Sequence, residues 1–167
     1  MNANLQKAID VFRIHDVYLH NSQSQCINGF DPKYDQNLDK LITQTKHGVK
    51  QSHLAQVDDS QRLVRVFIEV GARLIDPSVE QEKDSVRAFI EAEFIAEYTL
   101  DQDLNQACID EYALKNASYH VWPYWREFLM SQCTRMYLPR LVLPTIQLAH
   151  NRHQNCKEPE SIENSSN

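Results

Sequence analysis

Glycine is scarce in this chain, which has only three glycines among its 167 residues. Gly29, Gly48 and Gly71 lie far apart, so they cannot form a phosphate loop of the Walker type or of the dinucleotide type. Nucleotide-driven chemistry is therefore not expected, and the sequence predicts no cofactor.

Paired cysteines, clustered positive charge and long apolar runs are missing as well. The four cysteines form no CxxC pair, which predicts free thiols in a reducing compartment. The net charge of -6 argues against nucleic acid or an anionic membrane as the main partner, since both require clustered lysine and arginine. No run is long enough to span a membrane, and the first ten residues lack the apolar core of a signal peptide. We expect a cytoplasmic protein that binds no nucleic acid and does not insert into a membrane.

Two stretches alternate apolar and polar residues, as half-buried strands do. The first, 62–74, has one apolar face, made of Val64, Val66, Ile68, Val70, Ala72 and Leu74. The second, 85–98, repeats the pattern, and the polar connection around Pro77 predicts a surface loop between two antiparallel strands. Residues 11–20 and 48–57 have strand composition with weaker alternation, so we predict two further strands there. Residues 21–37 are turn-rich, and 38–45 fit either a short extended piece or the start of the next strand.

Helical periodicity replaces the strand pattern after residue 100. Asp101 or Asp103 is predicted to cap a first helix, and a second helix is predicted to begin at Pro123. The apolar stripe of the second helix consists of Trp125, Leu129, Cys133 and Met136. Pro139 and Pro144 then predict an extended segment, followed by a short helix from about Thr145.

The order of these elements predicts an α+β domain over residues 1–155. Its four strands would form an antiparallel sheet with the helices packed on one face. Residues 156–167 are polar and lack core residues, so we predict a disordered tail there.

Metal binding and catalysis receive weak support from the sequence. Residues 150–156 contain an HxxHxxC pattern, but on a helix these positions fan around the axis and no fourth ligand is evident. Glu91, Glu93 and Glu97 share one strand face, which resembles a general acid and base set, yet the neighbouring arginines indicate a solvated, ion-paired surface. We predict no metal site and no enzyme, with a small hydrolase that uses carboxylate chemistry as the alternative.

One block of the sequence resembles the C-terminal half of the SecB family of export chaperones. The hallmark is an aromatic or aliphatic residue, Pro-Tyr, a variable position and Arg-Glu, then a helix and a leucine-rich extended segment that contains proline. The matching residues are Trp122, Pro123, Tyr124, Trp125, Arg126, Glu127, Leu138, Pro139, Leu141, Leu143 and Pro144. Elsewhere the resemblance is one of architecture, over roughly residues 8–150.

The resemblance implies a chaperone that holds unfolded clients in hydrophobic grooves without ATP and assembles as a homotetramer, a dimer of dimers. It also implies two branches. In one the client is the antitoxin of a toxin-antitoxin system; in the other, clients are exported preproteins delivered to the SecA motor. The sheet face that docks SecA in exporters is acidic, whereas here it includes Arg65, Arg73 and Arg87, so we favour the antitoxin branch. An adaptor for one folded partner is the alternative from another class.

Aromatic residues gather around the start of the second predicted helix, and rigid rings offer a large contact area to clients of diverse sequence. The predicted client-binding residues are Tyr119, Trp122, Tyr124, Trp125, Phe128, Leu141, Leu143 and Ile146. The stripe formed by Trp125 and Leu129 also fits a core position.

A second set of apolar residues lies on the predicted sheet. An uncovered edge strand is a template for pairing with another chain, so the first strand is expected to form oligomer contacts. The predicted oligomer or partner contacts are Phe67, Phe89, Val11, Val17 and Leu19.

Overall fold

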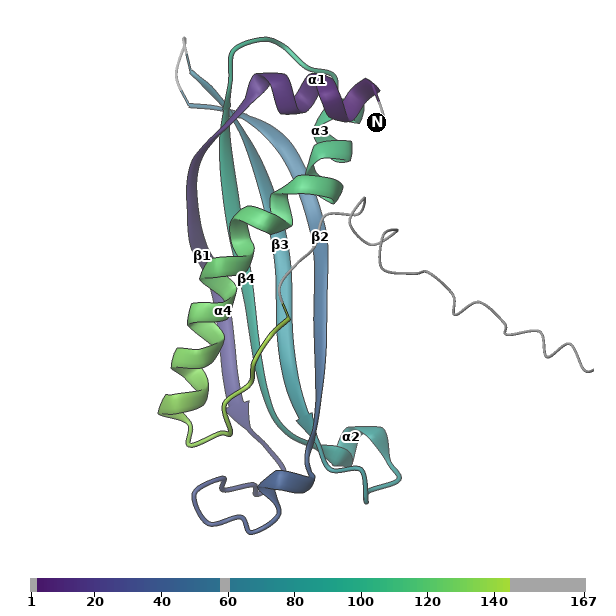
Figure 1. Cartoon of the computed structure of the whole chain (residues 1–167), viewed down its shortest axis with the longest axis vertical. Coiled ribbons are helices and arrows are strands. Elements are labelled where there is room, and N and C mark those ends of the chain that lie inside the picture. The colour runs from purple at the N-terminus through teal and green to yellow at the C-terminus, as the bar shows by residue number, and fades with distance from the viewer. Residues whose placement is uncertain (1–2, 58–60, 145–167) are drawn as a thin grey trace, which may run out of the picture.

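A computed structural model describes residues 3–57 and 61–144 of the chain, and Figure 1 shows their arrangement. Four strands form one antiparallel sheet in the order β1-β4-β3-β2. Their bounds are Phe12–Cys26 for β1, Ile42–Gln56 for β2, Arg62–Ile75 for β3 and Val86–Leu100 for β4. The longer helices lie over one face of the sheet, which we call the inner face (Figure 1). This arrangement confirms the predicted fold class.

Most of the helical residues follow the sheet in the sequence. Helix α3 (Gln106–Tyr112), a π-helical turn (Ala113–Ala117) and α4 (Ser118–Arg135) follow one another without a break. The other helices are α1 (Ala3–Val11), a 3-10 turn (Leu38–Lys40) and the short α2 (Glu82–Ser85). Within the described ranges, no helix is both long enough and apolar enough to cross a membrane.

The two central strands follow the alternation of the sequence closely. Every second side chain of β3 and β4 points to the inner face and is buried there. The edge strands β1 and β2 are longer than predicted. Strand β1 continues through polar residues as far as Cys26, and β2 already begins at Ile42. Asn21 to Cys26 pair with Glu93 to Ala88 of β4, and backbone pairing needs no apolar side chain. The predicted turn at 21–26 is therefore wrong.

Helices α3 and α4 both begin at residues other than the predicted ones. Asn105, and neither Asp101 nor Asp103, caps α3, since its side-chain oxygen accepts the backbone N–H of Cys108 at 3.0 Å. Pro123 lies in the second turn of α4 and not at a helix start, because the π-helical turn joins α3 and α4 into one continuous rod.

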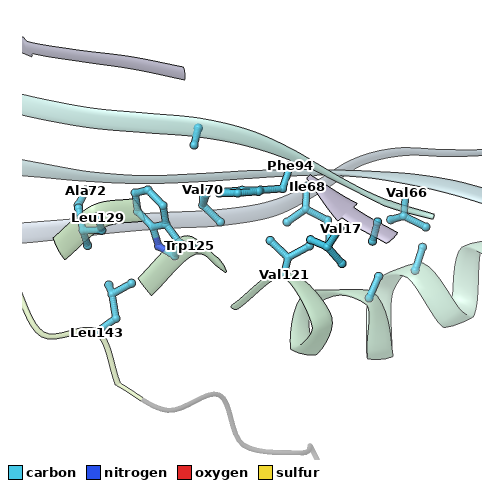
Figure 2. Close-up of a cluster of buried hydrophobic side chains, with 14 of the residues drawn as sticks. Val17, Val66, Ile68, Val70, Ala72, Phe94, Val121, Trp125, Leu129 and Leu143 are labelled. Carbon is cyan, nitrogen blue, oxygen red and sulfur yellow. The ribbon is translucent and has the colours of Figure 1, made fainter. Parts of the chain in front are cut away.

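The core lies between α4 and the inner face of the sheet (Figure 2). The predicted stripe of α4 is confirmed: Trp125, Leu129 and Cys133 are at most 2% exposed, and Met136 packs partly buried beside them. Phe128 stacks on Trp125 with ring centroids 6.2 Å apart and meets the edge of Phe94 from β4 at 6.3 Å.

A histidine joins the edge strand β2 to the helices. His47 Nε2 lies 2.7 Å from the Ser118 hydroxyl at the start of α4, and its ring meets the Trp122 ring edge-on with centroids 5.8 Å apart. Burial lowers the pKa of His47, because the charged imidazolium is less well solvated there than in water. The contact therefore favours the neutral ring.

We expect Leu129→Ala to lower the free energy of unfolding by about 2 to 5 kcal/mol, because it leaves a cavity in a fully buried site. Met130→Ala on the neighbouring, 38% exposed position is the control and should have a much smaller effect. Urea unfolding at fixed protein concentration measures both. Equal losses for the two variants would contradict the assignment of the core.

His47 makes stability depend on pH. Its folded-state pKa is below the ordinary value of 6.5, so its contribution is present above that value and is lost as the pH falls through the folded-state pKa. His47→Gln offers an uncharged amide to Ser118 and does not titrate. Between about pH 7.5 and about pH 5 the wild type should therefore lose more stability than His47→Gln, as urea unfolding would measure. Parallel losses would show that His47 is not the titrating group.

Candidate functional site

The predicted client-binding aromatic residues fall into two groups in the structure. Trp125 is 1% exposed and belongs to the core, so its ring offers no surface to a client in this conformation; the prediction needs this correction. Tyr124 is 48% exposed, whereas Tyr119, Trp122 and Phe128 are partly buried. Ile146 lies outside the described residues.

The predicted extended segment is present as residues 138–144, which we call the strap. It runs from the end of α4 across the helix-covered side of the sheet toward β2 (Figure 1). Leu138, Leu141 and Leu143 are buried at 8%, 9% and 5% exposure, whereas Val142 is 70% exposed. Leu141 and Leu143 therefore also need correction, because their side chains belong to the core of this conformation.

An exposed tyrosine follows the last helical turn of α4. Leu138 N–H bonds to the Cys133 carbonyl at 2.9 Å and Tyr137 N–H to that of Thr134 at 3.4 Å, the two bonds of a Schellman motif. Tyr137 occupies the left-handed position of this motif, with φ of 56°, where glycine is the usual residue. Its side chain is 64% exposed. A large residue in a conformation that disfavours it suggests that the ring is kept for a purpose other than stability.

The loop between β1 and β2, residues 27–41, brings a second tyrosine to the same end of the molecule. Asn28 Nδ2 donates to the Val86 carbonyl at 3.1 Å, which fixes the loop to the start of β4. Tyr34 is 73% exposed. Lys33 Nζ lies over both tyrosine rings, 5.4 Å from the centroid of Tyr34 and 5.5 Å from that of Tyr137. We call Tyr34 and Tyr137 the tyrosine pair.

Helical spacing of aromatic residues does not reveal the tyrosine pair, because neither ring belongs to a helical stripe. Tyr34 stands alone in a polar turn after Asp31 and Pro32, where an isolated ring has no core to join. Tyr137 comes directly after the last stripe residue, Met136, where a helix often places glycine. Both positions can therefore be identified from the sequence by looking for aromatic residues in turns, where side chains are exposed.

The outer face of the sheet carries charges that neutralise one another. The three candidate carboxylates all have cationic partners: Lys46 Nζ lies 2.8 Å from Glu91, Lys50 Nζ lies 2.8 Å from Glu93, and Arg65 Nε donates to Glu97 at 3.0 Å. The face is therefore a salt-bridged surface and not an isolated set of acids.

The predicted contact residues Phe67 and Phe89 lie on this outer face. Phe67 is 7% exposed, because the rings of His53 and His20 cover it at centroid distances of 5.4 and 5.7 Å. Arg65 also lies over its face at 5.4 Å. Phe67 is thus already covered within one chain, which corrects its interpretation as an open contact, whereas Phe89 is only partly buried.

The inner side of β1 offers apolar groups beside α4. Val11, which ends α1, and Val17 of β1 are 8% and 7% exposed and belong to the core of the chain itself, so their interpretation as open contacts also needs correction. Leu19 is 41% exposed and Ile14, which was not predicted, is 47% exposed. Leu19 and Ile14 are therefore available beside the unpaired edge of β1.

Metal ligands do not gather in the part of the chain that the structure describes. There, no group of three or more histidine, cysteine, aspartate or glutamate side chains is placed to hold an ion. The HxxHxxC pattern of residues 150–156 lies outside that part.

Comparison with known proteins gives a match in structure and none in sequence. The SecB-like chaperone Rv1957 of Mycobacterium tuberculosis, solved in complex with a ChAD peptide from the HigA1 antitoxin, superposes with a TM-score of 0.67. The match has 17% sequence identity and covers 87% of this chain and 98% of that chain. No protein-family profile and no curated protein sequence matches the chain. The predicted resemblance is confirmed at the level of the fold: this chain has the α+β fold of a SecB-like chaperone.

Proposed function

We propose that this chain is a cytoplasmic chaperone that binds unfolded client polypeptides, without ATP and without catalysis, and that its principal client is an antitoxin. The observation that carries the proposal is Tyr137, whose exposed ring occupies a left-handed position within a SecB-like fold. The antitoxin peptide bound to the structurally similar chaperone supports the choice of client class.

The tyrosine pair suits the capture of unfolded chains. A rigid ring gives a large apolar area and loses little conformational freedom on binding. Each buried client side chain contributes roughly 1.5 to 3 kcal/mol before ordering costs, so several such contacts are needed for micromolar binding. Lys33, placed over both rings, adds an ammonium group that can donate a hydrogen bond to a client carbonyl or carboxylate.

Export through SecA is the second candidate within the same class. In the exporters that the sequence resembles, the motor docks on an acidic sheet face. Here the acids of that face are paired with Lys46, Lys50 and Arg65, so little unpaired negative charge is offered to a motor. This electrostatic balance supports the antitoxin branch.

We also propose a homotetramer, built as a dimer of dimers. Strand β1 is a sheet edge, and exposed Ile14 and Leu19 lie beside its free backbone groups. An edge of this kind favours pairing with a second copy, because pairing satisfies the backbone and buries the apolar side chains together.

Replacing Tyr137 should separate chaperone activity from stability. Tyr137→Gly and Tyr137→Ala both remove the ring and should weaken client capture by about threefold to tenfold. Tyr137→Gly should be the more stable of the two by about 1 kcal/mol, because glycine has no steric penalty at positive φ. Client capture is measured as suppression of aggregation of an unrelated unfolded reporter protein at stoichiometric amounts without ATP.

The wild type must suppress aggregation for the proposal to hold, since an adaptor for one folded partner would not. If it suppresses aggregation and both Tyr137 variants do so equally well, the tyrosine pair is not the client site. A small hydrolase would instead show turnover that is lost in Glu91→Gln or Glu93→Gln.

The oligomer prediction is tested by light scattering at micromolar concentration. The wild type should have a mass several times the 19.5 kDa of one chain. Leu19→Glu should lower that mass, because a charge beside the β1 edge would have to be buried on pairing. Leu114→Glu, at a 64% exposed position of the π-helical turn near β2, is the matched control. A strictly monomeric wild type would refute the assembly.

A further inference from the structure

The strap is an extended segment that is held mainly by its leucines. Leu138, Leu141 and Leu143 join the same buried cluster as Trp125, Leu129 and Cys133 of α4 and Ala72 of β3. In Figure 2 the Leu143 side chain points from the strap toward the region where Trp125 and Leu129 lie. The side chain between the last two leucines, Val142, points away and is 70% exposed. The core therefore accepts apolar groups two positions apart on an extended backbone.

Few hydrogen bonds hold the strap in place. Its first residue completes the Schellman motif of α4. Near its other end, Trp122 Nε1 donates to the Pro144 carbonyl at 2.9 Å. No residue of the strap belongs to a strand. Pro139 and Pro144 lack an N–H and cannot donate in a sheet ladder.

The Trp122 bond fastens the strap to the rest of the fold. Trp122 is itself positioned by His47, whose ring meets it edge-on, and His47 is bonded to Ser118. Strand β2, the start of α4 and the end of the strap are thus connected through one indole ring. Losing its N–H would release the strap's C-terminal end and leave the apolar contact area of the ring largely intact.

We propose that the strap occupies a client site in cis, and that extended client segments with apolar residues at positions i and i+2 bind by displacing it. This inference rests on the proposed chaperone function and names the class of segment that the site accepts. A client needs two features of the strap: an extended backbone and two apolar side chains on one side. Displacement also exposes the core side of Trp125, the predicted client-binding residue that the closed conformation buries.

The test uses the full chain and a synthetic unstructured peptide in which leucine alternates with serine. Trp122→Phe removes the bond to Pro144 while keeping a ring, so the closed conformation is less favoured. It should bind the peptide about threefold to tenfold more tightly than the wild type, the range expected from loss of one neutral hydrogen bond in the closed state. Met130→Ala, on the exposed side of α4, should leave the affinity unchanged.

Leu143→Ser is the second variant, because its sign of effect distinguishes two roles. If Leu143 holds the strap closed, the variant binds the peptide more tightly; weaker binding would show that Leu143 itself contacts the client and would overturn displacement. Trp122→Phe also leaves Trp125 as the sole tryptophan, and its emission should change when the peptide takes the place of the strap.

The possible outcomes separate this inference from the function on which it rests. If the wild type and both variants bind the peptide with equal affinity and Trp125 emission does not move, clients bind elsewhere and strap displacement is refuted while the chaperone function stands. If no form of the protein binds the peptide or any unfolded reporter, both are refuted. Tighter binding by both variants together with the emission shift supports displacement.

Discussion

Burial of the α4 stripe against the inner face of β3 and β4 is the contact on which the rest of the structure depends. Trp125 and Leu129 fill the space between helix and sheet, and this fixes where α4 ends and where the strap begins. The end of α4 then places Tyr137 beside the loop that carries Tyr34, and its start places Trp122 beside the strap's last carbonyl. The two features proposed to handle clients are thus positioned by one apolar interface.

The two faces of the sheet have different roles: the outer face contributes to stability, and the inner face is where we propose that clients are recognised. On the outer face, charges pair across strands and Phe67 is covered by two histidines, so the surface is satisfied within one chain. On the inner face, apolar area is only partly covered by helices, and the strap completes the cover with three leucines and few hydrogen bonds. A cover of this kind can open at lower cost than a paired strand, because few bonds are lost.

Strict periodicity explains which parts of the fold the sequence predicts well. The central strands and the α4 stripe repeat an apolar residue at a fixed interval, so their faces could be identified without coordinates. Residues 21–26 could not, because they pair through the backbone while their side chains remain polar. The start of α4 was misplaced at Pro123, since a π-helical turn has no sequence signature that periodicity detects. For the site, the density of aromatic residues at 119–129 favoured Trp125, but tertiary packing buries that ring. Tyr34 and Tyr137 lie outside this stretch, in turns that leave their rings exposed.

The central claim is that the chain recognises unfolded polypeptides by burying their apolar side chains. Calorimetric titration of the purified protein with the alternating leucine peptide, repeated at several temperatures, measures this most directly. The account predicts saturable binding with a negative heat-capacity change, the mark of apolar surface leaving water. Saturable binding with no heat-capacity change, or no binding at all, would contradict it.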